Sequence, residues 1–107
     1  METQIHIGGR KIVNPNNILR LKGEINYTTI YFLDGRRKET VATTLKKIEA
    51  KLMAFPHFFR ITKSTIINLN CITEAHSKKV QMSNGECIIP SRRRGKVFFE
   101  SIWKGKD

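Results

Sequence analysis

The chain is poor in cysteine, in acidic residues and in long apolar runs, and each shortage excludes a class of protein. Its 107 residues include two cysteines, Cys71 and Cys87, without CxxC spacing. A disulfide scaffold is therefore excluded, and we expect reduced thiols in small apolar niches, with a redox switch as the alternative. No apolar run approaches the roughly 18 residues of a membrane span, and the N-terminus lacks the layout of a signal peptide. These features predict a cytosolic protein with no membrane partner.

The shortage of acidic residues leaves a large positive charge. Twenty lysines and arginines oppose nine aspartates and glutamates, which gives a formal net charge of +11. This surplus favours polyanionic partners, because cationic side chains release condensed counterions whatever the sequence of the polymer. A hydrophobic content of 39% is enough for one core, so residues 1–107 are expected to form a single domain.

The residue types of an enzyme active site are present but scattered. The carboxylates show no DxD or ExxH spacing, and His6, His57 and His76 lie far apart in the sequence. We therefore expect no catalytic activity, no metal and no cofactor. A nucleophilic Cys71 or Cys87 beside a histidine is the enzymatic alternative that sequence alone leaves open.

Short strand-like segments separated by turn residues predict a mainly β fold of antiparallel hairpins. The strongest turn signals are Gly8-Gly9, Asp34-Gly35 and Asn84-Gly85, which favour tight hairpins, and the run 14–17 adds further turn chemistry. The expected strands are residues 4–7, 11–13, 18–22, 28–33, 36–41, 71–75, 80–82 and 86–89.

Two segments show helical spacing instead. Leu45, Ile48 and Leu52 recur at i, i+3 and i+7, with Thr43 or Thr44 as the expected cap. The lysines between them are expected to be ordinary solvated residues. A second helix is expected from Ser91, with an apolar stripe that packs on the sheet, formed by Val97, Phe98, Ile102 and Trp103.

Two basic segments are candidates for nucleic-acid contact. Arg92, Arg93 and Arg94 follow Ser91 at the start of the C-terminal helix, where guanidinium groups can meet phosphates or guanine edges. A solvated charge run is the alternative. Lys63 lies between Thr62 and Ser64, whose hydroxyls can hold its ammonium towards a phosphate. Ser64 can equally cap a short helical turn over residues 65–68, and from sequence alone that structural role is favoured.

The order of these motifs resembles the LytTR family. The matching blocks span residues 18 to about 99, and they are Asn26-Tyr27-Thr28, Leu33-Asp34-Gly35-Arg36, Thr44-Leu45 with Leu52, Phe59-Arg60-Ile61, Ser64, Ile67-Asn68, Asn84-Gly85, Ile89-Pro90 and Ser91-Arg92-Arg93. The resemblance implies an elongated, mainly antiparallel β assembly with small helices. It also implies a bacterial transcriptional regulator that binds direct repeats in promoter DNA through loops.

The resemblance assigns roles to particular residues. Asn26 and Tyr27 are expected to read base edges in a major groove, with a buried strand aromatic as the alternative for Tyr27. Lys63, with Ser64 beside it, is expected to contact the DNA backbone. Arg92 is expected to make a bidentate contact with guanine, supported by Arg93. Two copies would then bind one direct repeat and recruit or block RNA polymerase.

The chain departs from the family pattern at two positions and in its length. Lys22 replaces a frequent acidic residue, and Ile25 replaces a frequent glycine, so a stiffer first loop is expected. No receiver domain precedes the motifs, and we expect a free-standing regulator.

An RNA-binding small basic β domain is the alternative function. Such RNA readers expose aromatic side chains on strands, whereas the aromatic residues here lie in apolar surroundings typical of a core.

Overall fold

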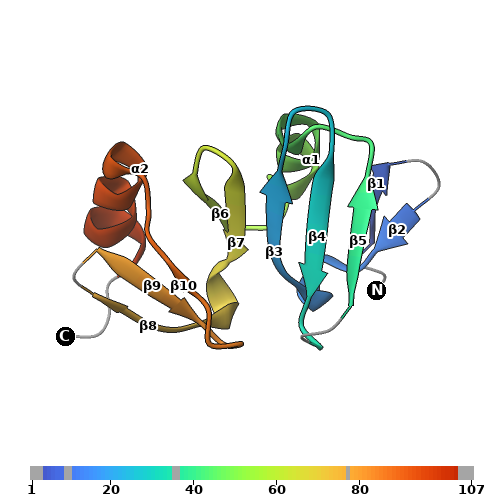
Figure 1. Cartoon of the computed structure of the whole chain (residues 1–107). Coiled ribbons are helices and arrows are strands. Elements are labelled where there is room, and N and C mark those ends of the chain that lie inside the picture. Colours follow the sequence, from blue (N-terminus) through green and yellow to red (C-terminus); the bar gives the residue numbers. More distant parts are fainter. Residues whose placement is uncertain (1–3, 9–10, 35–36, 77, 104–107) are drawn as a thin grey trace.

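A five-stranded antiparallel sheet is the centre of the computed structural model, which describes residues 4–8, 11–34, 37–76 and 78–103 (Figure 1). The strand order is β5-β4-β3-β7-β6. Their bounds are Ile18–Gly23 for β3, Thr28–Phe32 for β4, Lys38–Val41 for β5, Phe58–Thr62 for β6 and Thr65–Asn68 for β7. Because neighbouring residues of a strand point to opposite faces, Ile66 and Ile67 of β7 enter two separate cores.

The first core lies between this sheet, the hairpin of β1 (Ile5–Gly8) with β2 (Lys11–Val13), and helix α1 (Leu45–Leu52). The predicted amphipathic helix is confirmed, since Leu45, Ile48 and Leu52 are all buried. Thr44 is its cap, and its Oγ1 accepts a hydrogen bond from the backbone N–H of Lys47 at 3.4 Å.

The second core joins the other face of the central sheet to a three-stranded sheet and the C-terminal helix. The three strands are β8 (Ile72–His76), β9 (Lys79–Met82) and β10 (Cys87–Ile88), and helix α2 (Arg92–Val97) continues as the π-helix η3 (Phe98–Ile102). Phe98 is fully buried among Leu19, Ile61 and Ile67. The two cores lie along the longest dimension of the molecule, which measures 42 × 30 × 25 Å.

Short 3-10 helices occupy the remaining turns. They are η1 (Pro15–Asn17) and η2 (Leu69–Cys71). The side chain of Asn14 accepts a hydrogen bond from the backbone N–H of Asn16 at 2.9 Å, as expected of the predicted turn. The mainly β fold with a central and a C-terminal helix is thus confirmed. Within the described ranges, no helix is long and apolar enough to cross a membrane.

Two local predictions are wrong. Residues 65–68 form strand β7 rather than a helical turn, because this segment pairs with both β3 and β6. Val97 and Ile102 are 45% and 38% exposed, so the expected apolar stripe is incomplete. The π-helical hydrogen bond from Trp103 N–H to the Phe98 carbonyl changes the rotation per residue and breaks the stripe.

The cysteine prediction is half right, and some predicted turn residues lie outside the description. Cys71 and Cys87 are both free thiols, but only Cys71 is buried, and burial raises its pKa. Cys87 is exposed and occupies no apolar niche. Gly9, Gly35 and Arg36 lie outside the described residues, and β5 begins at Lys38, after the described non-strand residue Arg37.

Candidate nucleic-acid interface

The first candidate loop, Glu24 to Tyr27, joins β3 to β4. The backbone N–H of Glu24 donates to the carbonyl of Tyr27 at 2.8 Å, which leaves Ile25 and Asn26 at the tip. Ile25 is 89% exposed and Tyr27 is 53% exposed. The alternative of a buried strand aromatic at Tyr27 is therefore wrong.

Gly23 fixes where this loop begins. A Cβ atom at this position would lie 2.7 Å from Cβ of Leu45, the first residue of α1. Glycine therefore allows the end of β3 to lie directly against the start of the helix. The backbone N–H of Gly23 also donates to the carbonyl of Ser64 at 2.8 Å, which joins the first loop to the second.

The second loop contains Lys63 and Ser64 between β6 and β7. The side chain of Lys63 is exposed, whereas Ser64 is half-buried. The loop is closed by a hydrogen bond from the backbone N–H of Ser64 to Oγ1 of Thr62 at 3.2 Å. This arrangement places the ammonium of Lys63 in solvent at the end of a rigid hairpin.

The third segment is the start of α2. Ser91 is the N-cap residue by its backbone position, as expected, but its hydroxyl makes no capping hydrogen bond and is buried without a partner among the described residues. Its backbone N–H donates to the carbonyl of Ile61 at 3.1 Å, which ties the helix start to β6 next to the second loop. Arg92 and Arg93 are exposed.

These contacts bring all three predicted segments to one edge of the molecule. The β3–β4 loop, the β6–β7 loop and the start of α2 lie along the upper edge in Figure 1. The three segments carry four cations and one carboxylate, Glu24. The edge is therefore strongly electropositive.

The arginines fall into two groups by their partners. Arg20 and Arg60 form ion pairs with Glu86 and Glu49 at 2.7 and 2.8 Å. In the part of the chain that the structure describes, the side chains of Arg92 and Arg93 have no such carboxylate partner. The guanidinium groups of Arg20 and Arg60 are thus held within the fold, whereas among the described residues those at the start of α2 have donors without a carboxylate acceptor.

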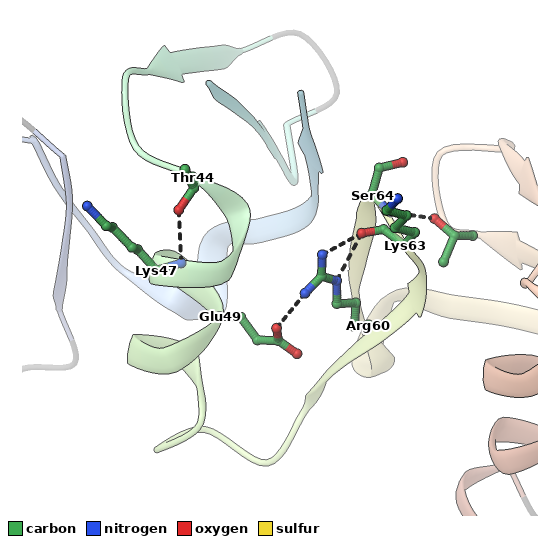
Figure 2. A network of polar contacts seen from close by, with 7 residues as sticks. Thr44, Lys47, Glu49, Arg60, Lys63 and Ser64 are labelled. Atoms are coloured by element: carbon green, nitrogen blue, oxygen red, sulfur yellow. Dashed lines mark hydrogen bonds and ion pairs between the residues drawn. The ribbon is translucent and has the colours of Figure 1, made fainter. Parts of the chain in front are cut away.

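Sequence reasoning missed the polar network behind the second loop. Figure 2 shows Arg60 between Glu49 of α1 and the carbonyl of Lys63. Nε and Nη2 of Arg60 donate to that carbonyl at 3.0 and 2.5 Å. Two signals were available: Arg60 lies within an apolar segment, and it belongs to the block Phe59-Arg60-Ile61 that resembles the family.

A second ion pair holds the two sheets together at a different place. Nε and Nη2 of Arg20 in β3 donate to the Glu86 carboxylate at 2.7 and 2.9 Å, next to the β9–β10 turn. The Arg20 guanidinium also lies 4.0 Å from the centre of the Tyr31 ring. The hydrogen bonds from Arg20 hold the pKa of Glu86 below its usual value.

The residue types that bind metal ions are dispersed over the described part of the molecule. Among the residues that the structure places, no group of three or more His, Cys, Asp or Glu side chains could hold a metal ion. His76 pairs with Glu74 at 3.0 Å on the exposed surface of β8. Exposed cations, rather than convergent acids and bases, are the distinguishing chemistry of this molecule.

Comparison with known proteins agrees with this geometry. Residues 8–103 match the family described as the LytTr DNA-binding domain. Among solved structures, the chain is similar to the LytTr DNA-binding domain of a methyl-accepting/DNA response regulator from Bacillus cereus. That similarity has a TM-score of 0.69 and 20% identity, and it covers 92% of this chain and 94% of that chain.

No curated protein matches the chain at a significant level. The solved structure therefore supports the fold, and the family match supports the class of partner. LytTR domains are a non-catalytic family. Because the family match extends over nearly the whole chain, the chain belongs to the LytTR family of DNA-binding domains.

Proposed function

We propose that this domain recognises specific sequences in promoter DNA through its three clustered loops. The observation that carries the proposal is the pair of backbone hydrogen bonds, Gly23 to Ser64 and Ser91 to Ile61, that holds three exposed segments at one edge. A fixed relative placement lets separate loops address one duplex in a single register.

The first and third loops read bases in this proposal. Asn26 and Tyr27 address base edges or a thymine methyl, and Arg92 makes a bidentate contact with O6 and N7 of a guanine. Successive major grooves on one face of DNA are about 34 Å apart, and the domain is 42 Å long. The length of the whole molecule is therefore comparable with the separation of two successive grooves.

The second loop contacts the backbone between those grooves. Lys63 offers a compact ammonium with three donors. Such a group suits a phosphate better than two acceptor atoms on the edge of one base. Ser64 donates a hydroxyl beside it, and Arg93 supports Arg92 from the next position. Two copies on a direct repeat would recruit or block RNA polymerase.

The comparison of duplex DNA with single-stranded RNA tests the class of ligand. Phe98 is buried, and Arg20 covers the ring of Tyr31 on the central sheet, which argues against a stacking platform for unpaired bases. In a gel shift, we expect the domain to retain labelled duplex DNA. Unlabelled duplex of the same sequence should compete more strongly than unlabelled duplex of other sequences. Tighter binding of single-stranded RNA would contradict the proposal.

A further inference from the structure

The side chain of Arg60 connects helix α1 to the proposed backbone-contacting loop. Its Nη1 donates to Oε1 of Glu49 at 2.8 Å, while Nε and Nη2 converge on the carbonyl of Lys63 (Figure 2). The Arg60 side chain is 23% exposed and that of Glu49 is 37% exposed. One guanidinium thus spans two elements and is partly shielded from solvent.

This geometry uses the particular shape of arginine. A guanidinium is planar and presents several N–H groups in fixed directions, so it can hold one carbonyl by two donors while a third donor meets a carboxylate. A lysine would keep the charge but offers a single nitrogen that cannot reproduce both contacts. The arrangement is therefore sensitive to shape as well as to charge.

Fixing the Lys63 carbonyl fixes the loop. The orientation of a carbonyl sets the plane of its peptide group, because that group is planar. The plane of the peptide group between Lys63 and Ser64 in turn restricts the backbone angle ψ of Lys63. The hydrogen bond from Ser64 N–H to Oγ1 of Thr62 holds the other polar group of the same peptide. Together these contacts fix the backbone from which the exposed Lys63 side chain projects.

Glu49 holds the guanidinium in place from the helix. Its helix also packs against the first loop, because Leu45 contacts the end of β3 at Gly23. The Gly23 N–H then meets the Ser64 carbonyl at 2.8 Å, which closes a ring of contacts through α1, β6, the second loop and β3. The two loops therefore share one support.

We propose that Arg60, oriented by Glu49, is a positioning residue that presents Lys63 to the DNA backbone. This role rests on the proposed function of Lys63. It assigns to α1, whose outer lysines carry no predicted site, an indirect part in DNA binding. Arg60 acts through Lys63, so the loss of Arg60 and the loss of Lys63 should not be additive.

A double-mutant cycle with Arg60→Lys and Lys63→Ala tests this role. Each variant is titrated with a duplex that the wild-type domain binds, at several salt concentrations. We expect Arg60→Lys to weaken binding about threefold to tenfold in the wild-type background and to have little effect beside Lys63→Ala. Glu49→Gln should show the same pattern at smaller amplitude, since it removes the ion pair but leaves the two hydrogen bonds to the carbonyl.

Two measurements separate this role from a general loss of folding. Amide hydrogen exchange in the free protein should accelerate at Ser64 in Arg60→Lys, with the protection of α1 and β3 unchanged. Glu39→Gln is the matched control, because it breaks the ion pair between Lys11 and Glu39 at 2.9 Å on the opposite side of the sheet. It should change neither the loop exchange nor the affinity.

The outcomes distinguish the two claims. If Arg60→Lys weakens binding equally with and without Lys63, Arg60 contacts DNA itself and the positioning role is wrong. If the exchange of the loop is unchanged, the role is also wrong, while the proposed function of Lys63 stands. If Lys63→Ala leaves both the affinity and the salt dependence unchanged, the function of Lys63 is wrong and the positioning role falls with it.

Discussion

Arg92 is the residue whose predicted role is most specific. It is exposed at the start of α2 and, in the described ranges, lacks a carboxylate partner. Its guanidinium group can therefore donate to a guanine. Arg92→Ala should remove the preference at one base position, at a cost of about 1–3 kcal/mol for the preferred sequence. Titration against duplexes substituted at each position measures this loss.

Arg94→Ala serves as the control for that experiment. It removes the same charge two residues later, where the side chain is half-buried. We expect a small and uniform loss of affinity from this change. Uniform weakening by Arg92→Ala as well, with the base preference intact, would show that Arg92 contacts phosphate only.

Lys63 is predicted to contact phosphate and to read no base. Lys63→Ala should weaken binding to all sequences alike and reduce the slope of log affinity against log salt by about one. Lys38→Ala is the matched control, since Lys38 is an exposed lysine at the opposite end of the β4–β5 pair from the first loop. The same slope for Lys63→Ala and Lys38→Ala would remove Lys63 from the interface.

At the scale of elements, Gly23 sets how closely β3 approaches α1. Gly23→Ala would place a methyl group 2.7 Å from Cβ of Leu45, and that neighbour cannot rotate away. We expect this variant to lose about 1–3 kcal/mol of unfolding free energy in urea, as overpacked sites do.

Gly85→Asn is the comparison for that variant. Gly85 has a φ of +92° and no atom within 4 Å of a built Cβ, and asparagine tolerates positive φ better than most residues. Any side chain is strained at this φ, but no overlap adds to the strain, so Gly85→Asn should cost less unfolding free energy than Gly23→Ala. Equal stability of Gly23→Ala and the wild type would mean that the strand and helix can separate at no cost.

The ion pair between Arg20 and Glu86 links β3 to the β9–β10 turn and should respond to acid. Hydrogen bonds from Arg20 lower the pKa of Glu86 in the folded state. The pair therefore stabilises the fold above the unfolded pKa, near 4.5, and this contribution is lost as the pH falls through the lower folded pKa. Glu86 is 40% exposed, so the effect is at most about 1 kcal/mol.

Glu86→Gln tests this contribution. Thermal melts between pH 7 and pH 3 should show a lower melting temperature for the variant at neutral pH and convergence with the wild type in acid. Glu39→Gln, which breaks a more exposed pair with Lys11, should show a smaller difference. A constant gap between Glu86→Gln and the wild type at every pH would contradict the electrostatic explanation.

Local patterns predicted most of these elements. Helix α1 follows from its 3.6-residue period and the Thr44 cap, and the hairpin at Asn84-Gly85 follows from turn chemistry. Residues 65–68 were ambiguous because a short apolar run does not distinguish a strand from a helical turn. Pairing with two neighbouring strands decided the matter, and this is a tertiary property.

The same limit applies to the interface. Tyr27 lies in a loop, Arg92 begins helix α2, and both are exposed. Their contacts with DNA stay predictions. The contact of Arg60 with Glu49 could not be predicted, since it joins a strand and a helix 11 residues apart along the chain. Only the packing of α1 beside β6 brings these side chains together.

At the scale of the whole molecule, two cores support the edge on which the three candidate segments lie. The five-stranded sheet contributes side chains to both cores through β3 and β7, so the first loop and the start of α2 belong to one rigid frame. A net charge of +11 favours association with any duplex, and we propose that the spacing of the three segments supplies the sequence preference.

Selection of bound duplexes from a random library tests this central claim most directly. Sequencing of the duplexes retained by the wild-type domain should recover one short sequence repeated in the same orientation, with a separation of about one or two helical turns. Retention of duplexes without a common sequence, or of sequences arranged as inverted repeats, would contradict recognition by three loops on a direct repeat.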